Sequence, residues 1–283
     1  MRFGSALCGL ALLAILAASA VQAQETEQDI VNRYLQKAVK QHTTKAGWAS
    51  INVSMDRINR QNDYNDFATL ESRDLSSGAF GWIEQGFSVG ADFGMILKER
   101  FAWSLGGEYW LKMGDELPTN EDYYIQSSGT TVTANPKSEI TLYGASTSLY
   151  YYVFNPPKPA TQLKGLSLRV GGSVGFYGVS WDLWPEYENL NLSTSEPVAT
   201  NTTFKDNAPG FSFGLGVEYP LNFFDLAISS DASYLYLNFD QVSWYNSQDE
   251  EIVASVDGTS DGRVDLDFSG FRGKVEIRKY FSW

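Results

Sequence analysis

The feature that most constrains the fold is a period-two alternation that runs from about residue 46 to the end of the chain. In one segment, for example, Phe101 and Trp103 alternate with Ala102 and Ser104. Side chains that alternate in this way point to opposite faces of a β-strand. Here one face is large and apolar, and the other is rich in glycine, serine and alanine. A soluble β-sandwich shows the reverse on its outer face, which carries charge.

Eight segments show this alternation, and we expect each to form a strand. They are 47–58, 79–97, 101–113, 139–154, 165–181, 209–219, 224–244 and 264–283. Each has at least the roughly 9–11 residues that a tilted strand needs to cross a bilayer. After the N-terminal segment, no apolar run reaches the roughly 18 residues of a membrane helix. Because only helices and closed barrels satisfy all backbone polar groups in lipid, the pattern predicts a barrel.

The connections between these segments alternate between long and short. The long ones are 59–78, 114–138, 182–208 and 245–263, and the short ones are 98–100, 155–164 and 220–223. Long loops at one end and tight turns at the other are typical of outer-membrane barrels. The formal net charge is −13, which argues against nucleic-acid binding, and most of the acidity falls in the long loops.

The long loop 114–138 leaves the strand number open. Its residues 123–125 and 130–133 alternate like the strands of a short hairpin. They form either a hairpin above the membrane, which leaves eight strands in the barrel, or two further strands of a ten-stranded barrel.

Aromatic residues gather toward both ends of the expected strands, as they do where amphipathic rings sit at the two bilayer interfaces. Those at the short-turn end are Phe101, Trp103, Tyr151, Phe154, Phe223, Phe224 and Phe281. Those toward the long-loop end are Tyr109, Tyr143, Tyr177, Trp181, Phe211, Trp244 and Tyr245.

The N-terminal 45 residues have a different character. Residues 1–23 read as a secretory signal peptide, with Arg2 before a short apolar region and small residues before a cleavage point after Ala23. Residues 24–45 show helical spacing of apolar residues. This amphipathic helix either plugs one mouth of the barrel or lies on the membrane. Cys8, the single cysteine, lies in the signal, so thiolate catalysis and cysteine metal sites are excluded from the mature chain.

The last strand carries the clearest family signal: Val275, Ile277, Phe281 and the terminal Trp283 share one face. This pattern resembles the C-terminal signature of bacterial outer-membrane β-barrels of the OmpA-like and porin-like families, although Lys279 interrupts it. The resemblance covers residues 46–283. It implies an all-β fold, an eight-stranded antiparallel up-and-down transmembrane barrel in the outer membrane of a Gram-negative bacterium.

The same resemblance implies further expectations. Both termini are expected in the periplasm, with no periplasmic domain after the barrel. The terminal strand is expected to be read by the barrel-assembly machinery, and the barrel wall to contact outer-membrane lipid and lipopolysaccharide.

Ionisable residues recur on the small-residue face of most strands, so we expect them to line the interior. These residues are Asp56, Glu84, Asp92, Glu108, Lys112, Arg169, Glu218, Asp231, Arg272, Lys274, Glu276 and Arg278. Buried charges must pair, because an unpaired buried ion is costly. An eight-stranded barrel is about wide enough for its own side chains. We therefore predict a structural salt-bridge network, with a narrow, gated ion path as the alternative.

The sequence offers little for catalysis. The lipid A acyltransferases, lipid A deacylases and omptin proteases use a catalytic histidine, and His42, the single histidine, lies before the first strand. The carboxylates around Asp249 and Asp257 match no EF-hand spacing. We predict no catalytic residue, cofactor or metal. The favoured function is a non-enzymatic barrel with a structural or surface-interaction role. The alternatives are a narrow porin-like channel and a loop-mediated adhesion protein with an extracellular ligand of unknown identity.

Overall fold

The computed structural model describes residues 46–74, 80–98, 100–116, 121–125, 130–135, 137–154, 165–184, 202–221, 224–245, 251–252 and 264–282. The predicted signal peptide, the helix of 24–45, His42 and Trp283 lie outside these residues. Within them, no helix has the length and apolar character required to span a membrane.

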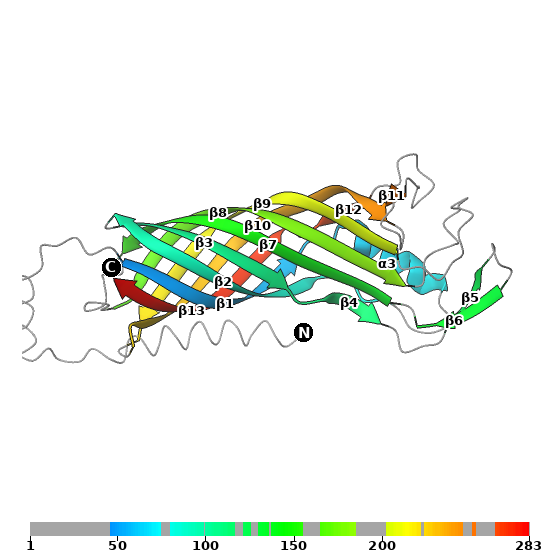
Figure 1. Ribbon diagram of the computed structural model, residues 1–283, viewed down its shortest axis with the longest axis horizontal. Helices are drawn as coiled ribbons and strands as arrows, with labels where there is room; N and C mark the ends of the chain where they lie inside the picture. Colours follow the sequence, from blue (N-terminus) through cyan, green and yellow to red (C-terminus); the bar gives the residue numbers. More distant parts are fainter. Residues whose placement is uncertain are drawn as a thin grey trace, which may run out of the picture.

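Eight long strands pair in a closed ring. They are β1 (Ala46–Ile58), β2 (Gln85–Lys98), β3 (Phe101–Trp110), β7 (Lys137–Phe154), β8 (Ser167–Trp184), β9 (Thr202–Pro220), β10 (Leu226–Tyr245) and β13 (Gly270–Ser282). Each pairs antiparallel with its neighbours in the order β10-β13-β1-β2-β3-β7-β8-β9, and β9 pairs with β10 to close the ring (Figure 1). The fold is therefore an antiparallel β-barrel.

The sheet holds eleven strands rather than the predicted eight. The additional strands are short: β4 (Met113–Glu116) pairs with β7, β12 (Val264–Asp267) with β10, and β11 (Glu251–Ile252) with the end of β10. β4 and β12 lie on the same partner strands as β3 and β13, from which two-residue breaks separate them.

The loop 114–138 forms a hairpin. Its strands β5 (Glu121–Ile125) and β6 (Thr130–Ala134) make a separate two-stranded sheet. This confirms the hairpin alternative, and the two segments do not join the barrel. In Figure 1 the hairpin lies beyond the barrel, at the end where α3 (Asp63–Asp74) is found.

Four neighbouring strands of the barrel are long, and three of them, β7, β8 and β9, are longer than predicted. β7, β8, β9 and β10 have 18, 18, 19 and 20 residues, about twice what a tilted strand needs to cross a bilayer. The loop predicted at 182–208 is correspondingly shorter, because β8 continues to Trp184 and β9 starts at Thr202. We call the end of the barrel with α3 and the hairpin the long-loop end, and the opposite end the short-turn end.

The chemistry of the wall reverses halfway along β8. Odd-numbered side chains face the interior throughout, first Arg169 and then Tyr177 and Trp181, which are 2% and 1% exposed. Even-numbered side chains face outward; Phe176 is 61% exposed, and Asp182 follows near the strand end. The barrel is thus apolar outside toward the short-turn end and apolar inside toward the long-loop end. Placing Tyr177 and Trp181 in an aromatic belt was therefore wrong.

An apolar cluster fills the long-loop half of the interior, and we call it the rim core. It joins α3 and the segment 80–83 to inward residues of β1, β3, β4, β7, β8, β9, β10 and β12. Its largest members are Tyr64, Phe80, Trp110, Tyr177, Trp181, Phe204, Phe239 and Phe268. Burying this surface supplies the hydrophobic stabilisation of a soluble domain, so this end of the barrel has a core of its own.

Side-chain hydrogen bonds hold α3 against the rim core. The Asn62 side chain accepts a hydrogen bond from the backbone N–H of Asn65 (2.9 Å), as a helix N-cap does. The Asn65 side chain in turn accepts one from the backbone N–H of Ile83 (2.8 Å). Tyr64 packs 5.2 Å from the Trp181 ring centre, and burial raises its pKa to about 12.

A substitution of Gly114 in β4 tests how closely the backbone is packed at the long-loop end. Its φ is +103°, and a Cβ there would lie 2.0 Å from the Ser138 carbonyl oxygen. We expect Gly114→Ala to lower the free energy of unfolding by about 1–3 kcal/mol, because the backbone is both strained and blocked. Urea unfolding in detergent micelles, followed by tryptophan fluorescence, measures this. Gly107→Ala, whose Cβ would meet nothing closer than 3.6 Å, is the control, and equal losses would contradict the prediction.

Candidate functional site in the barrel interior

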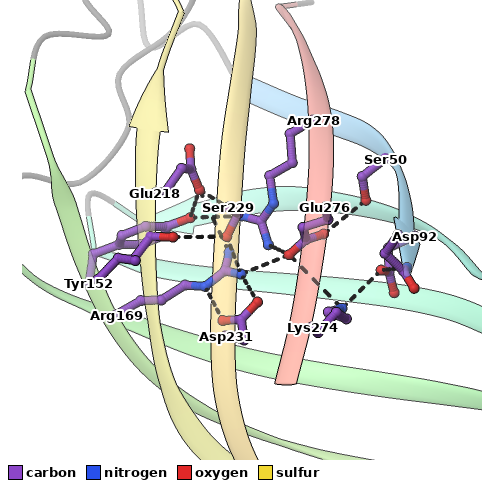
Figure 2. A network of polar contacts seen from close by, with 12 residues as sticks. Ser50, Asp92, Tyr152, Arg169, Glu218, Ser229, Asp231, Lys274, Glu276 and Arg278 are labelled. Atoms are coloured by element: carbon purple, nitrogen blue, oxygen red, sulfur yellow. Dashed lines mark hydrogen bonds and ion pairs between the residues drawn. The ribbon is translucent and has the colours of Figure 1, made fainter. Parts of the chain in front are cut away.

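Two buried arginines organise the interior near the short-turn end. Arg169 of β8 binds Asp231 of β10 through two nitrogens, at 3.1 and 2.6 Å, and Glu276 of β13 at 2.8 Å. Arg278 of β13 binds Glu218 of β9 at 2.8 Å and the same Glu276 at 2.5 Å. Both guanidinium groups therefore share one carboxylate, and Figure 2 shows them converging on it from different strands.

Neutral side chains complete the partners of these carboxylates. The Tyr280 and Tyr152 hydroxyls donate to Glu218 at 2.5 and 3.3 Å. The Ser50 hydroxyl donates to Glu276 at 3.0 Å, and Ser229 accepts a hydrogen bond from Arg169 at 2.8 Å. Since burial makes an unsatisfied charge expensive, these hydrogen bonds offset much of the desolvation cost.

Two smaller groups continue the network toward the long-loop end. Lys274 bridges Asp92 at 3.2 Å and Glu276 at 3.9 Å, at the edge of Figure 2. Farther along β13, Arg272 binds Asp56 at 2.6 Å and Glu108 at 2.9 Å. The inward positions of β13 thus supply three of the four cations that meet the acids of other strands.

Aromatic rings close the polar interior at both ends. Toward the short-turn end, Trp48 is fully buried and lies 4.8 Å from the Arg278 guanidinium carbon. Toward the long-loop end, Trp110 is fully buried and lies 5.3 Å from that of Arg272. Guanidinium groups over ring faces are attracted to them electrostatically. The described residues therefore stack in layers along the axis, from aromatic to ionic to aromatic and finally to the rim core.

Inward glycines make room for these rings. A Cβ on Gly94 would lie 2.1 Å from the Trp48 ring, and one on Gly144 would lie 2.2 Å from the Tyr177 ring. Small residues on the polar face thus accommodate large side chains from neighbouring strands.

A cavity of about 70 Å³ remains between the ionic groups. Its polar lining includes Asp92, Glu108, Arg169, Asp231 and Lys274. A polar cavity of this size holds a few water molecules. Among the described residues, no group of three or more histidine, cysteine, aspartate or glutamate side chains is placed to hold a metal ion.

Ten of the twelve residues predicted to line the interior meet in these ion pairs. Glu84 and Lys112 do not. Glu84 precedes β2 and pairs with Arg60 at the surface, at 3.0 Å. Lys112 follows β3, is exposed, and pairs with Glu139 at 2.5 Å. Both were predicted to face the interior because the predicted strands extended past the observed strand ends.

The neutral partners of the network were not among the residues predicted from the sequence. Ser50, Tyr152, Ser229 and Tyr280 lie on inward positions of strands that were predicted, so the same alternation identifies them. Trp110 of β3 is also inward and buried. It belongs to the rim core, whose apolar inward residues a membrane-only pattern does not anticipate.

The terminal strand shows the expected outward face. Val275 and Ile277 are exposed on the outer wall, and Phe281 lies 5.7 Å from the Phe93 ring centre. Lys279, the departure from the apolar pattern, reaches the turn before β10, where it pairs with Asp225 at 3.5 Å. An amphipathic cation placed near a strand end in this way keeps its charge out of the apolar layer.

The closed ring, the exposed apolar belt and the paired polar interior together define the class of protein. These are the features of a small transmembrane β-barrel, the architecture that the resemblance to the OmpA-like and porin-like families implies.

Several solved structures are similar to this chain, and three of them are given below. No protein-family model and no curated protein matches the chain. A major outer membrane protein of Thermus thermophilus is 15% identical over 85% of this chain and 100% of that one, with a TM-score of 0.46. Neisserial surface protein A is 11% identical over 84% and 97%, with a TM-score of 0.39. The outer membrane protease OmpT of Escherichia coli is 10% identical over 85% and 98%, with a TM-score of 0.32.

The ionic network makes a clear prediction for stability. Arg169→Met leaves Asp231, Glu218 and Glu276 without one of their cations in a buried layer. We expect a loss of about 3–5 kcal/mol in the free energy of unfolding, because breaking a buried pair strands an uncompensated charge. Arg60→Met, which removes an exposed ion pair with Glu84, is the control and should leave the urea midpoint unchanged. Similar midpoints for the two variants would show that the network does not stabilise the barrel.

Proposed function

We propose that the protein is a closed, non-enzymatic outer-membrane barrel with a structural or surface-interaction role. The observation that carries this proposal is the filled interior. An ionic layer lies between the buried rings of Trp48 and Trp110, and the rim core and α3 lie beyond. Its charged groups bind one another, so they hold the wall together instead of facing a substrate.

The alternative of a narrow channel has less support. The polar cavity between the ionic groups is only about 70 Å³, and aromatic rings bound the ionic layer on both sides. Conduction needs a continuous hydrated path, whereas here Arg169 and Arg278 cross the interior to reach acids on other strands.

We further propose that the long-loop end faces the outside of the cell and that both termini face the periplasm. In outer-membrane barrels the periplasmic turns are short and the extracellular loops are longer. The start of β1 pairs with the end of β13, Ala46 with Ser282, at the short-turn end (Figure 1). The hairpin β5–β6 and α3 would then be the surface that the protein presents to its surroundings.

Planar bilayers test the closed interior. We expect the purified, refolded protein to give no stable current steps under conditions in which a general porin opens, because the ionic layer and the rim core block the axis. Reproducible openings that scale with the amount of protein added would overturn the proposal in favour of the channel.

Single cysteines test the orientation, since the only natural cysteine lies in the predicted signal peptide. Thr131→Cys lies on the hairpin strand β6, and Arg100→Cys lies in the turn between β2 and β3. On intact cells, a membrane-impermeant maleimide should label Thr131→Cys and spare Arg100→Cys until the cells are lysed. The opposite pattern would reverse the topology.

A further inference from the structure

The positive and negative groups of the ionic network do not balance. Its cations are Arg169, Arg272, Lys274 and Arg278, and its carboxyl groups are Asp56, Asp92, Glu108, Glu218, Asp231 and Glu276. Four cations against six ionised acids would leave a net charge of −2 in the network. An uncompensated charge is costly where water is excluded, and a buried acid then tends to keep its proton.

The excess negative charge falls into two separate groups. Three of the cations bind four of the acids among them, and one of these acids, Asp92, lines the cavity of about 70 Å³, where water molecules can solvate it. Arg272 alone binds two acids, Asp56 at 2.6 Å and Glu108 at 2.9 Å. Asp56 is 1% exposed and does not line the cavity. The second excess charge is therefore shut off from solvent.

The two acids that share Arg272 differ in their remaining partners. Glu108 accepts hydrogen bonds from the Ser88 hydroxyl, at 3.2 Å, and from the Tyr177 hydroxyl. Asp56 accepts one from Arg272 through Oδ1, whereas its Oδ2 is buried and has no hydrogen-bond partner among the described residues. Because donated hydrogen bonds stabilise an ionised carboxylate, the contacts favour an ionised Glu108 and a neutral Asp56.

The surroundings of Asp56 supply no second cation. Among the described residues, the charged and titratable groups that face it are Arg272 of β13, Glu108 of β3 and Tyr177 of β8, which hydrogen-bonds Glu108. Its cross-strand partner on β2 is Gly86, where an added Cβ would meet the Trp110 ring at 2.6 Å. Trp110 belongs to the rim core. An ionised Asp56 would thus place an uncompensated charge where the ionic layer meets the rim core.

We propose that Asp56 keeps its proton in the folded barrel, so that Asp56, Arg272 and Glu108 form a proton-binding site that stabilises the barrel in acid. The site goes beyond the proposed surface role and does not depend on which way the barrel faces. An aspartate in an unfolded chain releases its proton to water at about pH 3.9. Folding above that pH therefore takes up one proton from solvent, and stability falls as the pH rises until the folded site releases it.

Urea unfolding in detergent micelles, from about pH 5 to about pH 8, tests this site. Asp56→Asn imitates the protonated acid, so its unfolding equilibrium constant should lack one proton's share of the pH dependence, which is about tenfold per pH unit. At about pH 8 we expect this constant to be at least about tenfold lower in the variant than in the natural protein. Glu108→Gln, which leaves Arg272 with a single acid, should remove the same share.

Asp231→Asn is the matched control. Asp231 is also inward, but Arg169 binds both of its oxygens, at 3.1 and 2.6 Å, so we expect it to be ionised. This variant should be less stable than the natural protein by a factor that does not change with pH. Infrared spectra at neutral pH should show the carbonyl band of a protonated carboxyl group in the natural protein and in Asp231→Asn, but not in Asp56→Asn.

Two results would overturn the proposal. If Asp56→Asn is destabilised at every pH, as the control is, then Asp56 is ionised and binds Arg272 as a carboxylate. If the carboxyl band is missing and sodium or potassium ions at constant ionic strength stabilise the natural protein but not Asp56→Asn, a metal cation neutralises the site instead of a proton. Heat-modifiable migration confirms that each variant is folded, and the infrared band of the natural protein needs no variant to fold.

Discussion

The rest of the barrel depends on the ion pairs that the inward side chains of β13 make with other strands. β13 pairs with β1 on one side and β10 on the other, so it joins the first strand of the ring to its last hairpin. Its Arg272, Lys274 and Arg278 reach acids on β1, β2, β3 and β9. One strand therefore links opposite parts of the wall through the interior. Because buried ions bind well only when every partner is in place, the network favours this closed pairing over slipped alternatives.

Two different cores share one continuous wall. Toward the short-turn end the barrel has the side-chain distribution expected in lipid. Apolar side chains such as that of Phe176 are exposed on the outside, and ion pairs lie inside. Toward the long-loop end it follows the rules of water, and the same inward positions of β8 carry Val179 and Trp181. The strands do not change direction or parity at the boundary. What changes is the side of the wall that carries the apolar residues, as is expected where the solvent outside a barrel changes from lipid to water.

Glycine has two separate uses in this wall. Inward glycines such as Gly94 and Gly144 lie against Trp48 and Tyr177 and allow a narrow barrel to contain large rings. Gly107 faces outward and has space above it. Both kinds of glycine occupy regular strand positions in the sequence, so they differ only in what surrounds them in the folded barrel. This difference separates the glycines that make room for buried rings from one that lies on the outer surface of the wall.

The sequence by itself determined the strands, their inward and outward faces, and most of the ionic residues of the interior. The reason is that side-chain alternation is local. The residues next to Arg169 and Glu276 in the sequence therefore indicate that both side chains face inward. The sequence-based predictions were wrong where the alternating pattern continued past a strand end, and where the inward face of the wall became apolar. Glu84 and Lys112 lie past the strand ends, and Tyr177 and Trp181 face a core instead of a bilayer.

Only the tertiary structure decided which charges pair and where the apolar side chains move from the outer to the inner face of the wall. Arg169 meets Glu276 across 107 residues of sequence, and nothing in the spacing of either strand specifies that contact. The rim core likewise needs α3 and eight strands to be brought together before its apolar residues have partners. Pairing and burial are properties of the closed ring, since they depend on strands that become neighbours only when β9, β10 and β13 complete it.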